Sequence, residues 1–166
     1  MRITEYKTLL NDQRIEHLIK ESSVNYTKEK TLDNGRKIVT MMNEIFLADQ
    51  LPEEHCWLLA FDSKMKLKGV IELSHGTVNQ TVVNNRETAI KLLLLNCVQF
   101  VMIHNHPSGC CQISKEDVIV TKKLAHLGVF IGCPMLDSIV IGKNEFYSFH
   151  ENANMPQISE DLIWNK

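Results

Sequence analysis

The sequence predicts an α/β protein, or an α+β one, built around a mixed β-sheet flanked by helices. Three observations indicate this class. Short apolar runs of strand length recur along the chain, segments with one apolar helical face lie between them, and several strands follow one another closely enough to form hairpins. The 166 residues, of which 44% are hydrophobic and 23% charged, are sufficient for one well-packed core.

The first fifty residues are expected to form an N-terminal helical extension. In residues 11–22, Ile15, Leu18 and Ile19 have the spacing of one helical face. A second helix is expected over residues 34–47. Its apolar stripe consists of Ile38, Met41, Met42, Ile45 and Phe46. A stripe of this kind usually packs in a core or against a partner and seldom binds a cofactor.

The middle of the chain alternates strands with one clear helix. Short runs with apolar or β-branched character predict strands over residues 56–61, 68–74, 81–83 and 98–103. Asn85 can cap a helix that continues RETAIKLLLL. Glu87 adds negative charge to the first turn of this helix, where the helix dipole favours it.

The C-terminal part contains a helix followed by closing strands. The helix is expected over residues 114–127, with Gly128 as its stop signal. Strands are expected over residues 129–131, 135–141 and 146–149, and the last dozen residues form a polar tail. The expected organisation is an N-terminal extension, a main domain and a C-terminal tail. Their ranges are residues 1–50, 51–150 and 151–166.

Charge, hydropathy and cysteine usage narrow the possible functions. A net charge of −2 and a pI near 6.4 argue against a broad nucleic-acid surface, although they do not exclude one. The apolar runs are far shorter than the roughly 20 residues of a membrane-spanning helix, and the N-terminus lacks the pattern of a secretory signal. The five cysteines form no disulfide or zinc-ribbon pattern. We therefore expect a cytoplasmic protein with reduced thiols.

The stretch FVMIHNHPSGCCQISKED, residues 100–117, carries most of the chemical information. Residues two apart in a strand project to the same side, so His104 and His106 present two imidazoles to one face while Asn105 points away. Imidazoles about 6 to 7 Å apart along a strand can converge on one metal ion. Pro107 ends the strand, and the Ser-Gly pair that follows allows a sharp turn.

The same stretch continues into a helix start. In Ser-Lys-Glu-Asp, the Ser114 side chain can accept a hydrogen bond from the backbone three residues on, and Asp117 is favoured in the first turn. On its own this pattern is a capping box without chemistry. Together with the two histidines, it gives a set of two imidazoles and a carboxylate that leaves a fourth metal position for water.

The full spacing, His-x-His-x(7)-Ser-x-x-Asp, resembles the zinc motif of the JAB/MPN (JAMM) metalloprotease superfamily. The surrounding IHNHPSG, SKED and LDSIVIG look most like its bacterial RadC-like branch. The resemblance covers about residues 52–149 and implies an MPN/JAB-like fold. It also implies that His104, His106 and Asp117 bind zinc, and that Ser114 donates a hydrogen bond to a developing oxyanion.

The superfamily also uses a glutamate placed just before an early buried strand as general base and acid. Glu54, followed by HCWLLAFD, matches this position best; Glu53 is adjacent, and period-two reasoning cannot separate the two without the strand register. The resemblance thus implies a zinc metallopeptidase that cleaves a peptide or isopeptide bond of a peptide or protein substrate through a zinc-activated water.

Two alternatives from other classes remain open. One is a non-catalytic MPN scaffold that binds partners through the stripe containing Met41, Met42 and Ile45. The other is a DNA-repair-associated accessory protein, although residues 1–50 offer only Gly35 for the hairpin turns of the helix-hairpin-helix module that RadC-like proteins often carry. A homodimer through the N-terminal helices is also expected.

Three further side chains could support the site. His55 and His75 would approach it if their strands neighbour the motif, and would then contact its ligands or face a substrate. Asp137 falls in the strand LDSIVI, where a buried carboxylate needs a partner. A hydrogen bond from a zinc-binding histidine to Asp137 is therefore one hypothesis.

Overall fold

The structure is a computed structural model that describes residues 1–76 and 83–158. Its strands are β1 (Arg2–Leu10), β2 (Glu16–Asn25), β3 (His55–Phe61), β4 (Leu67–His75), β5 (Gln99–Asn105), β6 (Met135–Ile141) and β7 (Phe146–Ser148). Its helices are α1 (Gly35–Phe46), α2 (Asn85–Leu94) and α3 (Lys115–Phe130), with a short 3₁₀ turn at Ala48–Gln50. The predicted mixed sheet with flanking helices is confirmed.

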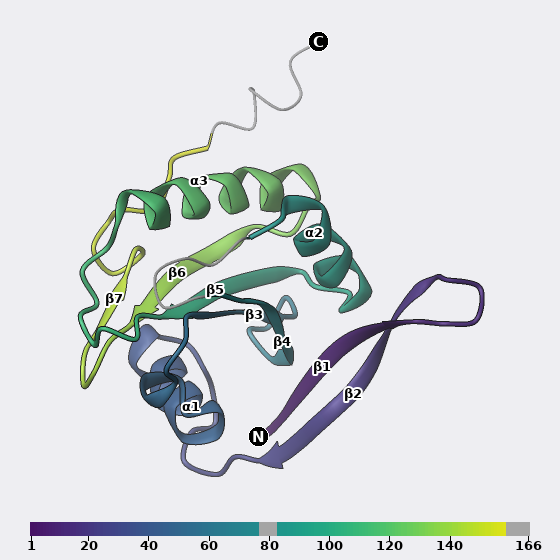
Figure 1. The fold of residues 1–166 in the computed structure, drawn as a ribbon, viewed down its shortest axis with the longest axis horizontal. Coiled ribbons are helices and arrows are strands. Elements are labelled where there is room, and N and C mark those ends of the chain that lie inside the picture. The colour runs from purple at the N-terminus through teal and green to yellow at the C-terminus, as the bar shows by residue number, and fades with distance from the viewer. Residues whose placement is uncertain (77–82, 159–166) are drawn as a thin grey trace.

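The described strands form one sheet in the order β2-β1-β4-β3-β5-β6-β7. The pairs β1·β4 and β5·β6 are parallel, and the other neighbours are antiparallel. Helices α2 and α3 cover one face of the sheet, and α1 covers the other (Figure 1). The paired strands β3, β5 and β6 lie in the middle of this three-layer arrangement.

Side-chain alternation along the central strands divides the core between the two faces. On β3, Trp57, Leu59 and Phe61 pack with the apolar side of α1. Cys56, Leu58 and Ala60 instead pack with residues of α2 and α3. Both sides of β3 are therefore buried, which explains why its sequence is a continuous apolar run and not an alternating one. This alternation decides which polar side chains at the strand ends meet.

The helix expected over residues 11–22 is wrong, because this region contains the turn and second strand of the β1–β2 hairpin. The Asn11 side chain accepts hydrogen bonds from the amides of Gln13 and Ile15, and Arg14 has a φ of 62°. These interactions close a turn that reverses the chain. The spacing of Ile15, Leu18 and Ile19 therefore arises without a helix. The hairpin extends away from the helices in Figure 1.

Other predicted elements need smaller corrections. The helix over residues 34–47 is confirmed as α1, and the cap of α2 is Asn84, one residue before the expected Asn85. Helix α3 continues through Gly128 to Phe130, so the strand expected over residues 129–131 is wrong. A Cβ at Gly128 would lie 2.6 Å from the Cys133 carbonyl oxygen, so this glycine allows close packing instead of ending the helix. Of the strand expected over residues 81–83, residues 81 and 82 lie outside the described residues.

The N-terminal segment is continuous with the main sheet. β1 pairs with β4, and the Ile38, Met41 and Met42 side chains of α1 are buried in the same core as Trp57. The division at residues 50 and 150 stays a prediction. The homodimer expected through the N-terminal helices also stays a prediction. Of the helices in residues 1–76 and 83–158, none has the length and apolar character needed to cross a bilayer.

Candidate metal centre

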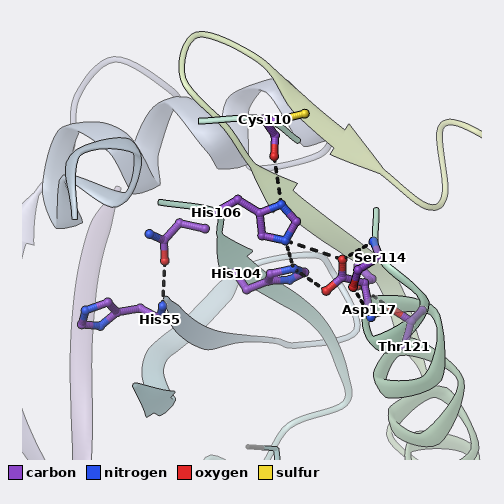
Figure 2. Close-up of polar contacts among 9 residues, drawn as sticks. His55, His104, His106, Cys110, Ser114, Asp117 and Thr121 are labelled. Carbon is purple, nitrogen blue, oxygen red and sulfur yellow. Dashed lines mark hydrogen bonds and ion pairs between the residues drawn. The ribbon is translucent and has the colours of Figure 1, made fainter. Parts of the chain in front are cut away.

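Two histidines and one aspartate meet at the end of β5. The Nε2 atoms of His104 and His106 are 3.2 Å apart. His104 Nε2 lies 2.9 Å from Asp117 Oδ1, and His106 Nε2 lies 3.5 Å from Asp117 Oδ2. Figure 2 shows the two rings and the carboxylate directed toward one another. One candidate ligand atom from each side chain lies within 4.8 Å of the other two, a separation that one metal ion can bridge.

The strand end and the turn after it position the two histidines. His104 is the penultimate residue of β5 and is only 4% exposed. The His106 amide donates a hydrogen bond to the Ile141 carbonyl at 2.8 Å. The Gly109 amide donates one to the His106 carbonyl at 2.9 Å. Gly109 has a φ of +81°, a conformation that a residue with a Cβ adopts only with strain, so the turn requires glycine here.

The start of α3 positions the carboxylate. Ser114 is the N-cap; its side chain accepts a hydrogen bond from the Asp117 amide at 3.0 Å, and Asp117 Oδ2 accepts one from the Ser114 amide at 2.7 Å. One turn further along α3, the buried Thr121 hydroxyl is 2.8 Å from that of Ser138 on β6. These contacts hold the first turns of α3 against the sheet and fix the position of the carboxylate.

The interactions between these groups set their protonation. Burial opposes ionisation of Asp117, but its hydrogen bonds with His104 and His106 outweigh that effect and hold the pKa of the carboxyl well below its ordinary value. The hydrogen bond with Asp117 raises the pKa of His106. His106 Nδ1 lies 2.9 Å from the Cys110 carbonyl oxygen, which can only accept, so Nδ1 carries a proton and Nε2 faces the carboxylate.

The three side chains line a pocket of about 650 Å³. Glu54 and Ser114 line the same pocket, whereas Glu53 does not. Register explains the difference: Cys56 is paired with His104, so residues two apart from Cys56, including Glu54, lie on the face of the histidines. Burial raises the pKa of the Cys56 thiol, which also lines the pocket, so this thiol stays protonated.

Asn105 is a site residue that sequence reasoning missed. As expected, it does not face the candidate metal ligands; the residue is 2% exposed, and both ends of its side-chain amide make hydrogen bonds. Its Oδ1 accepts from the His55 amide at 2.7 Å, and its Nδ2 donates to the Glu53 carbonyl at 3.0 Å. Asn105 therefore clamps the backbone on both sides of Glu54. No sequence pattern indicates this contact, because it depends on which strand lies beside β5.

The other expected supporting residues are placed differently. His55 and His75 are paired neighbours on β3 and β4, but His55 lies on the sheet face opposite Cys56 and His104. The hypothesis that Asp137 holds a metal-binding histidine is wrong: its carboxylate accepts from the Ser138 amide, the Ser148 hydroxyl and the His150 amide. Asp137 thus anchors the turn after β7.

Comparisons with known proteins found a family model and several curated relatives that match this chain. A model of the RadC-like JAB domain matches residues 32–155. A UPF0758 protein of Desulforamulus reducens is 32% identical over 132 residues, which are 70% of this chain and 58% of the relative. A UPF0758 protein of Clostridium botulinum is 30% identical over 165 residues, 88% of this chain and 72% of the relative.

A third UPF0758 protein, from Coprothermobacter proteolyticus, is 38% identical over 96 residues, 58% of this chain and 41% of the relative. The chain spans about half the length of the first curated relatives it matches. The family match covers the strands, helices and turn that build the pocket, and it begins before α1. The chain belongs to the RadC-like JAB domain family.

Proposed function

We propose that this chain is a zinc-dependent hydrolase, a JAMM-type metallopeptidase or isopeptidase that cleaves a peptide or isopeptide bond. The observation that carries the proposal is that one pocket contains three convergent metal-ligand side chains together with the Glu54 carboxylate. Family membership supports the same class of chemistry. The proposal requires a bound metal, a group that moves protons and a donor for the oxyanion.

The donor set fits zinc. Two imidazole nitrogens and one carboxylate oxygen form a common ligand set for catalytic zinc, which keeps a further position for water. His106 is held by Cys110 in the tautomer that leaves Nε2 for a metal, and Asp117 is held by the Ser114 amide. In such a site, the chemistry expected from zinc is Lewis acidity, which lowers the pKa of a coordinated water from 15.7 toward about 7.

The protein's own groups carry the proton transfers. The Glu54 carboxylate accepts a proton from the water while the water oxygen attacks the scissile carbonyl carbon. Glu54 then gives that proton to the leaving nitrogen as the carbon–nitrogen bond breaks. The Asn105 clamp restricts the backbone on either side of Glu54, which limits where its carboxylate can move. Glu54 is partly buried and lines the pocket, so a substrate bound there would lie beside it.

Ser114 supplies a hydrogen bond to the developing negative charge. Its oxygen already accepts from the Asp117 amide, so the hydroxyl proton remains as the donor toward the pocket that Ser114 lines. A donor fixed by a helix cap needs little rearrangement when the carbonyl oxygen becomes an oxyanion. Capping and catalysis therefore use different atoms of the same residue.

The two alternative functions have less support. The Met41 and Met42 side chains that would form a scaffold's docking stripe are fully buried, so this stripe belongs to the core. For a DNA-associated role, the basic residues in the stretch 28–37 are partly neutralised, because Lys28 pairs with Glu44 and Lys37 lies 2.8 Å from Asp33. The pocket's ligand set has no role in either alternative.

Metal content tests the first requirement. Elemental analysis of the purified wild type should give about one tightly bound zinc per chain, and Asp117→Ala should lose it. Ser114→Ala is the matched control, because it removes the helix cap but none of the metal ligands; it should retain zinc. Absence of zinc from the wild type after supplementation at neutral pH would contradict the proposal.

Turnover tests the second requirement. With a library of peptides and isopeptide-linked peptides as substrates, Glu54→Gln should keep zinc and lose activity by about 10²-fold or more. Glu53→Gln is the matched control, since this neighbouring carboxylate lies outside the pocket, and it should retain turnover. Equal loss of activity in both variants would refute the role of Glu54. A zinc-loaded wild type without hydrolytic activity would favour the scaffold function.

A further inference from the structure

A second cluster of metal-ligand side chains lies at the neighbouring strand ends. His55, the first residue of β3, is paired with His75, the last residue of β4. Their rings are stacked, with centroids 4.7 Å apart and planes inclined by 13°. Glu53 Oε2 lies 2.7 Å from His75 Nε2. One candidate ligand atom from each of these three residues lies within 4.8 Å of the other two.

This cluster is separate from the metal centre described above. Cys56 is paired with His104 and lies on the face of the sheet covered by α2 and α3. His55 precedes Cys56 and stacks on Trp57, which packs with α1 on the opposite face. The sheet therefore separates the two ligand sets, and neither shares a side chain with the other.

The surroundings of His55 resemble those of a metal ligand. Its Nδ1 lies 2.5 Å from Glu72 Oε1, so a carboxylate holds one ring nitrogen and the lone pair of the neutral ring is left on Nε2. A carboxylate behind a histidine is the usual support of a metal-binding imidazole, because it fixes the tautomer and increases the basicity of the ligand. The His55 ring also stacks on both Trp57 and His75, and these contacts further fix its plane.

We propose that Glu53, His55 and His75 form a second binding site, which takes a divalent transition-metal cation such as Zn²⁺. Two imidazoles and one carboxylate favour zinc, copper or nickel over Mg²⁺ or Ca²⁺, which prefer ligand sets made of oxygen. The cation would join the start of β3 to the end of β4. Because the Asn105 side chain bonds the backbone of Glu53 and His55, two of the three ligands come from a segment that is already fixed.

Exposure distinguishes the expected behaviour of this site from that of the buried one. The side chains of Glu53 and His75 are 48% and 56% exposed, whereas those of His104 and Asp117 are 5% and 10% exposed. Ligands in water lose more conformational freedom on binding and keep a hydrated alternative, so the second site should bind zinc more weakly and exchange it faster. Zinc at this site is therefore expected to be removed by dialysis while the buried site retains its metal.

A zinc titration tests the proposal without reference to activity. The full chain is stripped with a chelator, desalted and titrated with ZnCl₂ by calorimetry, and equilibrium dialysis at fixed free zinc gives the stoichiometry. The wild type should bind about two zinc ions per chain in two affinity classes. His75→Gln should lose only the weaker class. His150→Gln is the matched control because His150 is exposed and lies outside both ligand sets; it should retain both classes.

The outcomes separate a built site from general binding of zinc by histidines. If His75→Gln still binds one zinc ion with the higher affinity, its fold and the site at His104, His106 and Asp117 are intact. If His75→Gln loses both classes, Glu53→Gln decides, and loss of the weaker class alone in that variant supports the site. A single class in the wild type, an unchanged weaker class in His75→Gln, or equal weakening in His150→Gln would each overturn the proposal. The two proposals are tested separately, because the two ligand sets share no residue and Asp117→Ala changes only the first. Failure of the second site would therefore leave the proposed hydrolase function unaffected.

Discussion

The Asn105 clamp gives the sharpest prediction from this structure. Asn105→Ala removes the acceptor of the His55 amide and the donor to the Glu53 carbonyl, both of which lie beside the proposed base Glu54. The side chain is 2% exposed, so water does not reach its position freely. The variant should therefore be less stable than the wild type and should also hold Glu54 less firmly.

The magnitude follows from what each backbone group can do instead. The His55 amide points into the sheet toward β5, so leaving it unpaired costs about 1–3 kcal/mol. Glu53 is exposed, and its carbonyl can be hydrated after the change, so its loss costs about 0.5–1.5 kcal/mol. The expected loss is about 1.5–4.5 kcal/mol in total. For a chain of this length, that lowers Tm by roughly 3–18 °C.

Urea unfolding followed by tryptophan fluorescence measures this loss. A chelator is kept in all samples, so that differences in metal binding do not enter the comparison. Asn85→Ala is the matched control because Asn85 is exposed at the start of α2; it should change stability by less than about 0.5 kcal/mol. The proposed zinc ligands His104, His106 and Asp117 are untouched in Asn105→Ala, so this variant should bind zinc there as the wild type does.

Two results would refute the reasoning. One is an Asn105→Ala variant as stable as Asn85→Ala with an unchanged m-value, which would mean that the clamp contributes nothing. The other is unchanged turnover in a destabilised Asn105→Ala variant that retains zinc, which would mean that the clamp does not position Glu54. The expected pattern is a lower kcat with zinc content preserved.

The remaining predictions concern the helix start, the buried aspartate and the metal. Ser114→Ala should lose about 1 kcal/mol of stability in urea unfolding, because an N-cap is removed. Burial raises the pKa of Asp137, so near pH 4 the folded protein binds more protons at this residue than the unfolded chain does. The stability of the wild type should therefore fall relative to that of Asp137→Asn as the pH rises above about 4. A stability difference that stays constant between about pH 3 and pH 8 would contradict this. Saturating zinc, at about 100 times its Kd, should stabilise the wild type by about 2.7 kcal/mol, and Asp117→Ala should show no such gain from the tight site in thermal unfolding.

Several features of the site could be predicted because they depend on neighbours in sequence. His104 and His106 share a side through strand alternation, and the Ser114–Asp117 capping box is a pattern within one helical turn. The sharp turn at Gly109 likewise follows from local residue types. The predicted cap of α2, Asn85, is one residue from the observed cap, Asn84, because the two asparagines are adjacent and equally able to cap a helix.

Features that depend on strand pairing could not be predicted in this way. The apolar spacing over residues 11–22 matches a helix, but tertiary pairing in the β1–β2 hairpin overrides it. Gly128 resembles a helix stop, yet its missing side chain serves close packing against Cys133. In both cases, local propensity contributes less free energy than the contacts the folded chain makes elsewhere.

By itself, the sequence determined the class of fold and the convergence of His104, His106 and Asp117, because strand period and helix-start geometry act over a few residues. Only the tertiary structure decided that Glu54 and not Glu53 lines the pocket, that Asn105 clamps the chain beside it, and that His55 meets His75 on the opposite face. The physical reason is register: shifting a strand pairing by one residue exchanges its two faces, and the sequence of one strand does not specify its partner.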